Sequence, residues 1–229
     1  MDQWQGVWIV IAAYNEEGSI GEVLAELSRL PCKIIVVDDG STDLTSQTAL
    51  EYPVTVLRHI VNLGQGAALQ TGMSYALLQL DVTTIVTYDA DGQHDPQDIS
   101  RLIAPIASGD ADAVLGTRFG AGAKAVGIPA GRRRLLKVAV AFTRLTTGLA
   151  VTDTHNGLRA FSAKAARQIN ITSNRMAHAS ELLDQIRRLK LRFTEVPVSV
   201  RYTPYSLGKG QSIFEAVNVL WDILVGGSK

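Results

Sequence analysis

Residues 34–43 read IIVVDDGSTD, and this stretch decides the fold of the chain. The first four residues are apolar and β-branched, which predicts a strand that is covered on both faces. The six residues that follow have the composition of a tight turn, and Asp43 is suited to cap a helix behind it. A buried strand that leads through a polar turn into a helix is the repeating unit of a parallel, wound α/β sheet.

The same alternation of short apolar runs and helical patterns extends outward from this stretch. Strands are expected at residues 7–13, 33–37, 54–59, 83–88, 113–117, 158–162 and 193–202. Helices are expected at residues 18–29, 44–51, 65–79, 97–107, 131–147 and 177–190. A Gly/Ala-rich loop is expected at residues 120–127. These patterns predict an α/β fold with a mostly parallel central sheet and helices on both faces.

The length of 229 residues fits one α/β catalytic domain, which we assign to residues 1–211, followed by a C-terminal amphipathic helix and tail at residues 212–229. Cys32 is the only cysteine, so the sequence holds neither a disulfide framework nor a zinc cluster. The sequence shows no signal peptide and no uncharged apolar run near the roughly 20 residues of a membrane span. We therefore expect a soluble or peripheral protein in a reducing cytoplasm.

Charge is balanced overall but uneven along the chain. The 22 basic residues cancel the 22 acidic ones, and we expect no nucleic-acid partner. No acidic residue lies between Asp112 and Asp153. The basic residues of this interval are Arg118, Lys124, Arg132, Arg133, Arg134, Lys137 and Arg144. This cluster favours contact with phosphate or anionic lipid, and the alternative is a solvated basic helix face.

Acidic residues collect where the predicted strands end. The sequence DADGQH at residues 89–94 directly follows the expected strand at 83–88. In an open parallel sheet the ligand crevice lies beyond the carboxyl ends of the strands. The carboxylates of Asp89 and Asp91, together with the side-chain oxygen of Gln93, can hold a hard divalent cation. We expect Mg²⁺ or Mn²⁺, which would share its remaining coordination positions with water and a diphosphate.

Asp38 and Asp39 stand at the end of another predicted strand and have two interpretations. As turn residues they would hydrogen-bond their own loop. A carboxylate at this position could also accept a hydrogen bond from a nucleobase N–H, which turn chemistry alone does not explain. The nearby sequence NLGQG at residues 62–66 lacks the features of a phosphate loop, so its glycines are interpreted as turn and close-packing residues.

Five segments together resemble the family 2 glycosyltransferases, and within them the dolichyl-phosphate and polyprenyl-phosphate mannose and glucose synthases. The segments are YNE at 14–16, VDDGSTD at 37–43, NLGQG at 62–66, DADGQH at 89–94 and DTHNGLR at 153–159. The resemblance covers about residues 7–212, and the order and spacing of the segments are more specific than any single one. It implies a GT-A fold and a nucleotide-diphosphate-sugar donor.

The resemblance also implies roles for individual residues. Those expected to contact the nucleotide sugar are Ala12, Tyr14, Glu16, Val37, Asp38, Asp39, Asp89, Ala90, Asp91 and Arg118. The expected metal ligands are Asp89, Asp91 and Gln93. The residues expected to bind the acceptor's phosphate are Arg133, Lys137, Arg159 and Lys209. The residues expected to act in catalysis are Asp91, Arg118, Arg133 and Asp153.

Three departures from the family pattern bear on these roles. Ala12 replaces a proline two residues before the tyrosine of the first strand. Lys137 replaces a serine one turn after Arg133, which aligns with the lipid-phosphate arginine. An arginine near the C-terminus is missing, and Lys209 or Arg201 could substitute for it.

We predict an inverting, metal-dependent transfer of a hexose to a polyprenyl phosphate such as dolichyl or undecaprenyl phosphate. The acceptor oxygen would already be anionic, so no general base would be needed. Arg118 would offset the charge of the leaving diphosphate with a fixed donor fork.

Several alternatives remain open at this point. A sugar hydroxyl acceptor, as in polysaccharide synthesis, would need Asp153 or His155 as a base. Asp153 and Arg159 could instead form an ion pair across their loop. A non-catalytic nucleotide-sugar-binding regulatory subunit is the alternative from another class, although the intact Asp-x-Asp argues against it. A sugar-phosphate nucleotidyltransferase would carry a Gly-rich, basic loop after Ala13, which this sequence lacks.

A polyprenyl acceptor also implies a membrane surface. Residues 213–225 predict a short amphipathic helix, and the basic helix at 131–147 is the more suitable lipid-facing element. We expect a protein that lies peripherally at the inner, cytoplasmic face of the membrane. A small integral membrane subunit that docks on residues 213–225 is a plausible partner.

Overall fold

The computed structural model describes residues 2–119, 122–126, 140–141, 143–145, 148–154, 156–173 and 177–201. Three of the expected phosphate-binding residues, Arg133, Lys137 and Lys209, lie outside these ranges, as does His155. The predicted C-terminal helix and most of the predicted helix at 131–147 also lie outside them.

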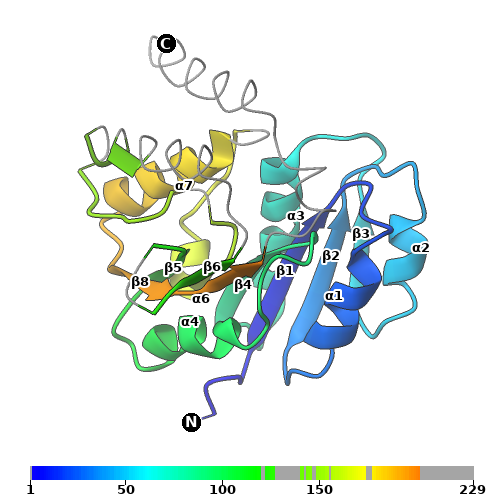
Figure 1. Ribbon diagram of the computed structural model, residues 1–229, viewed down its shortest axis with the longest axis horizontal. Coiled ribbons are helices and arrows are strands. Elements are labelled where there is room, and N and C mark those ends of the chain that lie inside the picture. The colour runs from blue at the N-terminus through cyan, green and yellow to red at the C-terminus, as the bar shows by residue number, and fades with distance from the viewer. Residues whose placement is uncertain are drawn as a thin grey trace.

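A seven-stranded sheet forms the centre of the molecule (Figure 1). Its strand order is β3-β2-β1-β4-β7-β5-β8. The strands are β1 (Val7–Ala13), β2 (Lys33–Asp38), β3 (Thr55–Arg58), β4 (Thr84–Asp89), β5 (Ala113–Thr117), β7 (Arg159–Ser162) and β8 (Phe193–Pro197). All neighbouring pairs are parallel except β4 with β7 and β5 with β7. The predicted α/β fold with a mostly parallel sheet is therefore confirmed.

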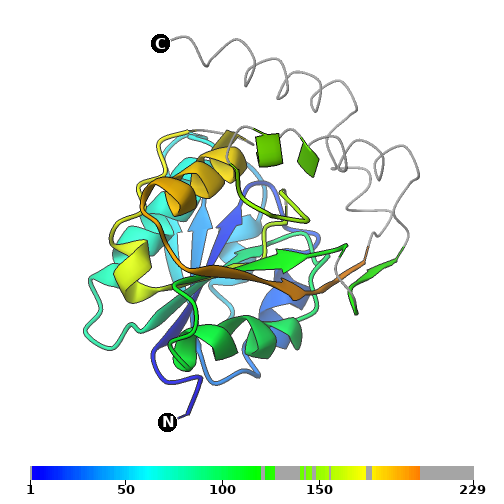
Figure 2. The same cartoon turned by 90° about the vertical axis from the view of Figure 1, so that its left-hand side faces the viewer.

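Helices cover both faces of this sheet (Figures 1 and 2). They are α1 (Ile20–Leu27), α2 (Thr45–Ala49), α3 (Gln65–Leu77), α4 (Asp98–Ala107), α6 (Ala163–Ala166) and α7 (Ala177–Arg188). Successive side chains of a strand point to opposite faces, so a strand covered on both sides must be apolar throughout. In β1, Ile9 and Ile11 pack with α1 and α4, whereas Trp8 and Val10 pack with α3.

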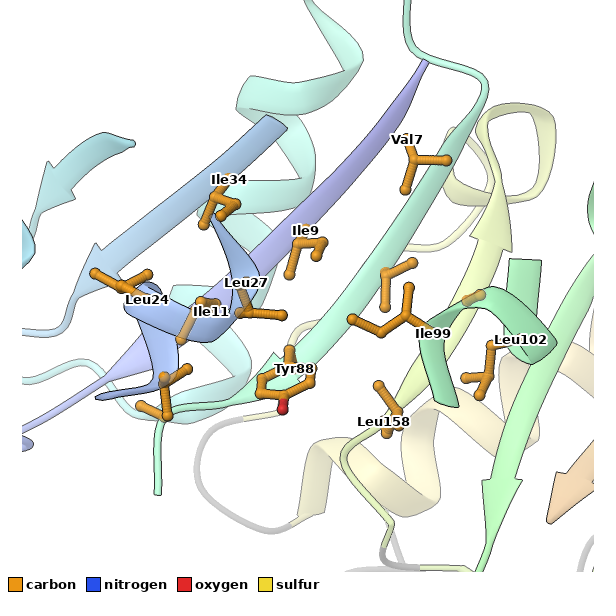
Figure 3. Close-up of a cluster of buried hydrophobic side chains, with 14 of the residues drawn as sticks. Val7, Ile9, Ile11, Leu24, Leu27, Ile34, Tyr88, Ile99, Leu102 and Leu158 are labelled. Carbon is orange, nitrogen blue, oxygen red and sulfur yellow. The ribbon is translucent and has the colours of Figure 1, made fainter. Parts of the chain in front are cut away.

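The layer between the sheet and helices α1 and α4 is one of two hydrophobic cores. Figure 3 shows its side chains, among them Ile9, Leu24, Tyr88 and Leu102 from four different elements. The second core lies on the other face, beneath α3 and α7, and includes Met73 and Leu182. Two opposed cores hold the strands at fixed register, which fixes the loops at their carboxyl ends.

The structure corrects three expectations from the sequence. The predicted loop at 120–127 contains a short strand, β6 (Lys124–Val126), and the predicted strand at 193–202 is two strands, β8 and β9 (Ser199–Arg201). β6 pairs with β9 in a second, two-stranded sheet. Such a pairing joins segments some 75 residues apart, so local periodicity does not reveal it. The third difference is α6, a single turn that Ser162 caps by accepting a hydrogen bond from the Ala165 N–H.

Strand β7 determines which loops lie at the edge of the sheet where the parallel strands have their carboxyl ends. It runs antiparallel between β4 and β5, and its first residue, Arg159, pairs with Thr87 of β4 and Leu115 of β5. Its amino end therefore lies beside their carboxyl ends. As a result, the chain before β7, which includes Asp153, joins the polar loops that follow β1, β2, β4 and β5.

Within the described part of the chain, no helix is long and apolar enough to cross a membrane.

Candidate active site

Asp89, the last residue of β4, is held by side chains from two other segments. Its Oδ1 accepts a hydrogen bond from Gln65 Nε2 at 3.1 Å, and its Oδ2 lies 3.0 Å from His94 Nε2. The His94 ring packs edge-on against Tyr88, whose hydroxyl donates to the His94 carbonyl at 2.8 Å. Burial raises the pKa of Asp89, but the hydrogen bond and charge of His94, followed by the charges of Arg159 and His178, outweigh burial and lower it. Asp89 is therefore held as an oriented anion.

The pKa of Asp91 shifts in the opposite direction from that of Asp89. Burial, and next the charge of Asp89, raise the pKa of Asp91 to about 6. Its Oδ1 accepts a hydrogen bond from the Gln93 N–H at 3.1 Å, which keeps Asp91 on the inside of the turn. An ionised Asp91 is thus destabilised by its neighbours, and a bound cation would relieve that cost.

The residues around Asp91 fit a hard divalent cation. Asp89, Asp91 and Gln93 offer carboxylate and amide oxygens, the ligands that Mg²⁺ and Mn²⁺ prefer. Within the described ranges, no three His, Cys, Asp or Glu residues are grouped so that they could hold a metal ion. Mg²⁺ usually keeps several waters, so water and a diphosphate would complete the coordination shell that these side chains begin.

Gly157 lets the loop before β7 approach Asp89. A Cβ added at Gly157 would fall well inside van der Waals contact of the Asp89 carboxylate. The Gly157 carbonyl accepts a hydrogen bond from the Thr87 hydroxyl at 2.7 Å. The absence of a side chain at position 157 therefore permits both contacts.

Replacing Gly157 with Ala is expected to displace the Asp89 carboxylate and lower turnover about 100-fold or more, because a displacement near 1 Å at a reacting group costs that much. Steady-state kinetics and Mn²⁺ binding measured by electron paramagnetic resonance check this result. Gly109→Ala is the control, since a Cβ there meets no atom within 4 Å, although its positive φ adds backbone strain. A Gly157→Ala enzyme with the turnover of the Gly109→Ala enzyme would contradict the prediction.

Arg118 and Asp153 form a buried ion pair next to the acidic turn. Arg118 Nε lies 2.7 Å from Asp153 Oδ2, and Arg118 Nη2 lies 2.8 Å from Asp153 Oδ1. The Arg118 backbone N–H also donates to Asp153 Oδ2 at 3.1 Å. Two parallel bonds fix the plane of the guanidinium as well as its charge. Asp153 thus makes its direct bidentate contact with Arg118, whereas Arg159, the partner that the sequence suggested, interacts with Asp153 through its charge.

Arg159 lies close enough to interact with both acidic groups of the site. Burial lowers the pKa of Arg159 to about 10, although the charges of Asp89 and then Asp153 act to raise it. Arg159 therefore remains protonated at neutral pH. The buried residues Arg118, Arg159 and Asp153, together with the partly exposed Asp89, form one cluster of two arginines and two aspartates.

Asp38, the last residue of β2, and Asp39, which directly follows it, have structural roles in this conformation. Asp38 is fully buried and accepts hydrogen bonds from the Ser41 N–H and the Ser46 hydroxyl. The turn role is confirmed for Asp38, whereas Asp39 binds a different loop, and contact of either residue with a nucleobase stays a prediction.

Asp39 holds the loop that follows β3. It accepts hydrogen bonds from the backbone N–H groups of Leu63 at 2.9 Å and Gly64 at 2.7 Å, and it lies 2.7 Å from His59 Nδ1.

The remaining residues expected around the nucleotide sugar differ in solvent exposure. Tyr14 is 45% exposed, whereas Val37 and Ala90 are buried.

The sequence did not reveal several residues that shape the site. Gln65 and His94 belong to recognised segments, but their hydrogen bonds to Asp89 had no signal of their own. The close-packing role of Gly66 is confirmed, because a Cβ there would clash with the Ser173 carbonyl. Glu195 of β8, described below, lay in a predicted strand without any recognisable motif.

Sequence comparison finds that this chain is similar to glycosyltransferases. A family model described as "Glycosyl transferase family 2" matches residues 8–169. The UDP-N-acetylglucosamine–dolichyl-phosphate N-acetylglucosaminyltransferase of Methanococcus voltae is 32% identical over 96% of this chain and 95% of its own length. The polyprenol monophosphomannose synthase of Mycolicibacterium smegmatis is 28% identical over 93% of this chain and 84% of its own length.

The fold also matches solved structures. Glucosyl-3-phosphoglycerate synthase from Mycobacterium tuberculosis, in complex with Mn²⁺, uridine diphosphate and glucosyl-3-phosphoglycerate, superposes with a TM-score of 0.71. The sequence identity is 21%, and the match covers 96% of this chain and 79% of that one. At this identity the comparison establishes a shared fold.

Proposed function

This chain belongs to glycosyl transferase family 2 and is a glycosyltransferase with a GT-A fold, and on that premise we propose that it transfers a hexose from a nucleotide-diphosphate sugar to a polyprenyl phosphate. The names of the Methanococcus and Mycolicibacterium relatives, each with a polyprenol-type acceptor, support this acceptor. The bound nucleotide and Mn²⁺ of the Mycobacterium synthase support a nucleotide-sugar donor and a metal.

The observation that favours a phosphate acceptor is the state of Asp153, one of the two candidate bases; the other, His155, lies outside the described residues. A sugar hydroxyl would need a base to remove its proton, and that base must be accessible and able to bind the proton. Asp153 is 3% exposed, and both its carboxylate oxygens accept hydrogen bonds from Arg118. A phosphate acceptor is already an anion and needs no base. Asp153 then acts by orienting Arg118.

On the donor side, Asp89, Asp91 and Gln93 would hold a divalent cation, which would supply positive charge to the diphosphate of the donor. Arg118 supplies a second, fixed positive charge at the same edge. Gln65 and His94 orient Asp89 before the donor binds, which lowers the cost of reorganising this part of the site. Displacement of the diphosphate by the phosphate oxygen from the opposite side inverts the anomeric carbon, which gives a β-linked product from an α-linked donor.

On the acceptor side, Arg133, Lys137 and Lys209 bind the lipid phosphate, and Arg159 adds positive charge from within the cluster. A largely apolar cavity of about 550 Å³ supports a lipid next to this site. Among the described residues it is lined by Phe119, Val140, Ala141, Arg144, Leu145 and Thr152. Phe119 follows Arg118 directly, so an isoprenoid chain in the cavity would leave its phosphate near the donor. Because such a substrate is embedded in a membrane, the proposal places the enzyme at a membrane surface, and we expect the cytoplasmic one, with or without a small membrane subunit.

Replacing Arg133 and Lys137 with Ala is expected to lower transfer to polyprenyl phosphate about 100-fold, while the donor Kd changes less than about threefold, because both side chains are assigned to the acceptor alone. Transfer of labelled sugar to lipid and calorimetric titration with the nucleotide sugar measure the two effects. Arg188→Ala is the matched control, since Arg188 is an exposed cation on α7. Equal losses in both measurements, or transfer to a free sugar with none to lipid, would favour the hydroxyl acceptor.

A further inference from the structure

Glu195, in edge strand β8, binds the loop that carries Asp153. Glu195 Oε1 accepts hydrogen bonds from the backbone N–H groups of Thr152 at 2.7 Å and Asp153 at 3.3 Å. Glu195 Oε2 accepts a hydrogen bond from the Thr152 hydroxyl at 2.8 Å. One carboxylate therefore fixes the backbone of two consecutive loop residues and one side chain.

A second contact extends this arrangement to Arg118. The hydroxyls of Thr117 and Thr152 lie 2.7 Å apart. A hydroxyl has one proton, and Thr152 gives its proton to Glu195, so Thr117 must be the donor in this contact. The Thr117 oxygen in turn accepts a hydrogen bond from the Phe119 N–H at 3.2 Å. A chain of hydrogen bonds in one direction thus runs from Phe119 through Thr117 and Thr152 to Glu195.

Hydrogen bonds that end at the Glu195 carboxylate therefore hold both Arg118 and Asp153, the two partners of the ion pair. The chain of hydrogen bonds spans Arg118, because Thr117 and Phe119 are its neighbours in sequence. Asp153 is held through its backbone N–H, and its own carboxylate binds the Arg118 side chain. Glu195 itself pairs with Leu115 in the sheet, so its position is set by the register of β5 and β8.

We propose that Glu195 is a positioning residue that orients the ion pair of Arg118 and Asp153 for sugar transfer. This inference rests on the proposed function only for the role of Arg118 toward the diphosphate. The orientation itself is a property of the free protein. Glu195 does not touch the donor, and its effect passes through Thr152 and Asp153.

The chain offers an internal control with the same chemistry. Glu181 on α7 accepts hydrogen bonds from the Thr172 N–H, the Thr172 hydroxyl and the Ser173 N–H. This is the same set of donors that Glu195 uses, namely a threonine and the next residue. Glu181 has no contact with Arg118 or Asp153 among these bonds. Loss of Glu181 therefore measures the general cost of releasing such a loop.

The test compares Glu195→Ala, Glu195→Gln, Thr152→Val, Thr152→Ser and Glu181→Ala. Hydrogen exchange of the Arg118 Nε–H, followed by nuclear magnetic resonance, reports the ion pair without any substrate. Exchange is expected to be at least about tenfold faster in Glu195→Ala and Thr152→Val, and near the wild-type rate in Thr152→Ser and Glu181→Ala. Glu195→Gln should stay within about threefold of wild type, because an amide oxygen accepts both N–H groups and its NH₂ can donate to Thr152.

Kinetics provide the second measurement. Glu195→Ala and Thr152→Val should lower kcat about 10- to 100-fold with donor KM within about threefold, and Thr152→Ser and Glu195→Gln should restore most of kcat. If Glu195→Ala fails to fold, the Thr152→Val and Thr152→Ser pair decides the question. Unchanged Arg118 exchange, or an equal kcat loss in Glu181→Ala, would overturn the proposal. A wild-type enzyme that transfers no sugar to lipid would refute the proposed acceptor, and the exchange result would still stand.

Discussion

Replacing Asp91 with Asn is expected to reduce sugar transfer at least about 10³-fold and, at the same time, to stabilise the metal-free protein at neutral pH. Activity falls because the proposed cation loses its charged ligand, and with it the neutralisation of the leaving diphosphate. Stability rises because burial and the charge of Asp89 disfavour an ionised Asp91 in the folded protein.

The sign of the pH dependence follows from the raised pKa. The pKa of Asp91 rises from its ordinary value of 3.8 to about 6 in the folded protein. Below about pH 4 the carboxyl is protonated in both folded and unfolded chains, and no penalty exists. Between about pH 4 and 6 the unfolded chain ionises first, so wild-type stability falls, and above pH 6 the full penalty of about 1 to 3 kcal/mol remains. Asn at this position cannot ionise and escapes the penalty.

Thermal melting between pH 4 and 8, in chelator and in Mn²⁺, measures this difference. In chelator, the melting temperature of the Asp91→Asn variant should exceed that of wild type above pH 6 and should converge with it near pH 4. Added Mn²⁺ should stabilise only the wild type. Asp110→Asn, a change in an exposed acid at the opposite edge of the sheet, serves as the control. Full turnover in excess chelator would refute the metal assignment. An equal difference in melting temperature between the two proteins at every pH would refute the raised pKa of Asp91.

Replacing Asp153 with Ala is expected to cost about 3 to 5 kcal/mol of unfolding free energy and most of the activity. The change leaves Arg118 buried without its bidentate partner, and breaking one side of a buried ion pair has this cost. Arg118→Met should cost less, because Arg159 remains close enough to stabilise the charge of Asp153. In Asp153→Ala, by contrast, the repulsion between Arg118 and Arg159 is no longer offset by the charge of Asp153.

A double variant separates stability from function. Arg118→Met with Asp153→Leu replaces the ion pair by apolar side chains of similar volume and should recover most of the lost stability. It should not recover transfer, because the fixed positive charge for the diphosphate is gone. Urea unfolding and single-turnover kinetics on the two single variants and the double variant measure these effects. A double variant with wild-type turnover, or an Asp153→Ala protein within about 1 kcal/mol of wild type, would contradict the role of the pair.

Local sequence determined the layered architecture and the positions of the acidic loops. The strand expected at residues 7–13 is β1 (Val7–Ala13), and the one expected at 113–117 is β5 (Ala113–Thr117). These spans are predictable because a strand covered on both faces must be apolar along its whole length. The turn at Asp38 and the acidic segment at 89–94 follow such strands directly, so their place at the carboxyl edge also follows from the order of residues.

Tertiary structure alone decided which side chains meet at that edge. The antiparallel insertion of β7 between β4 and β5 carries Asp153 to Arg118, 35 residues away along the chain. Gln65 reaches Asp89, and Glu195 reaches Thr152, across still other elements. Periodicity and turn composition are set by neighbours within a few residues, whereas these contacts depend on strand order and register. For this reason the sequence located both acidic turns but suggested Arg159 as a partner of Asp153. In the folded chain Asp153 makes its bidentate contact with Arg118.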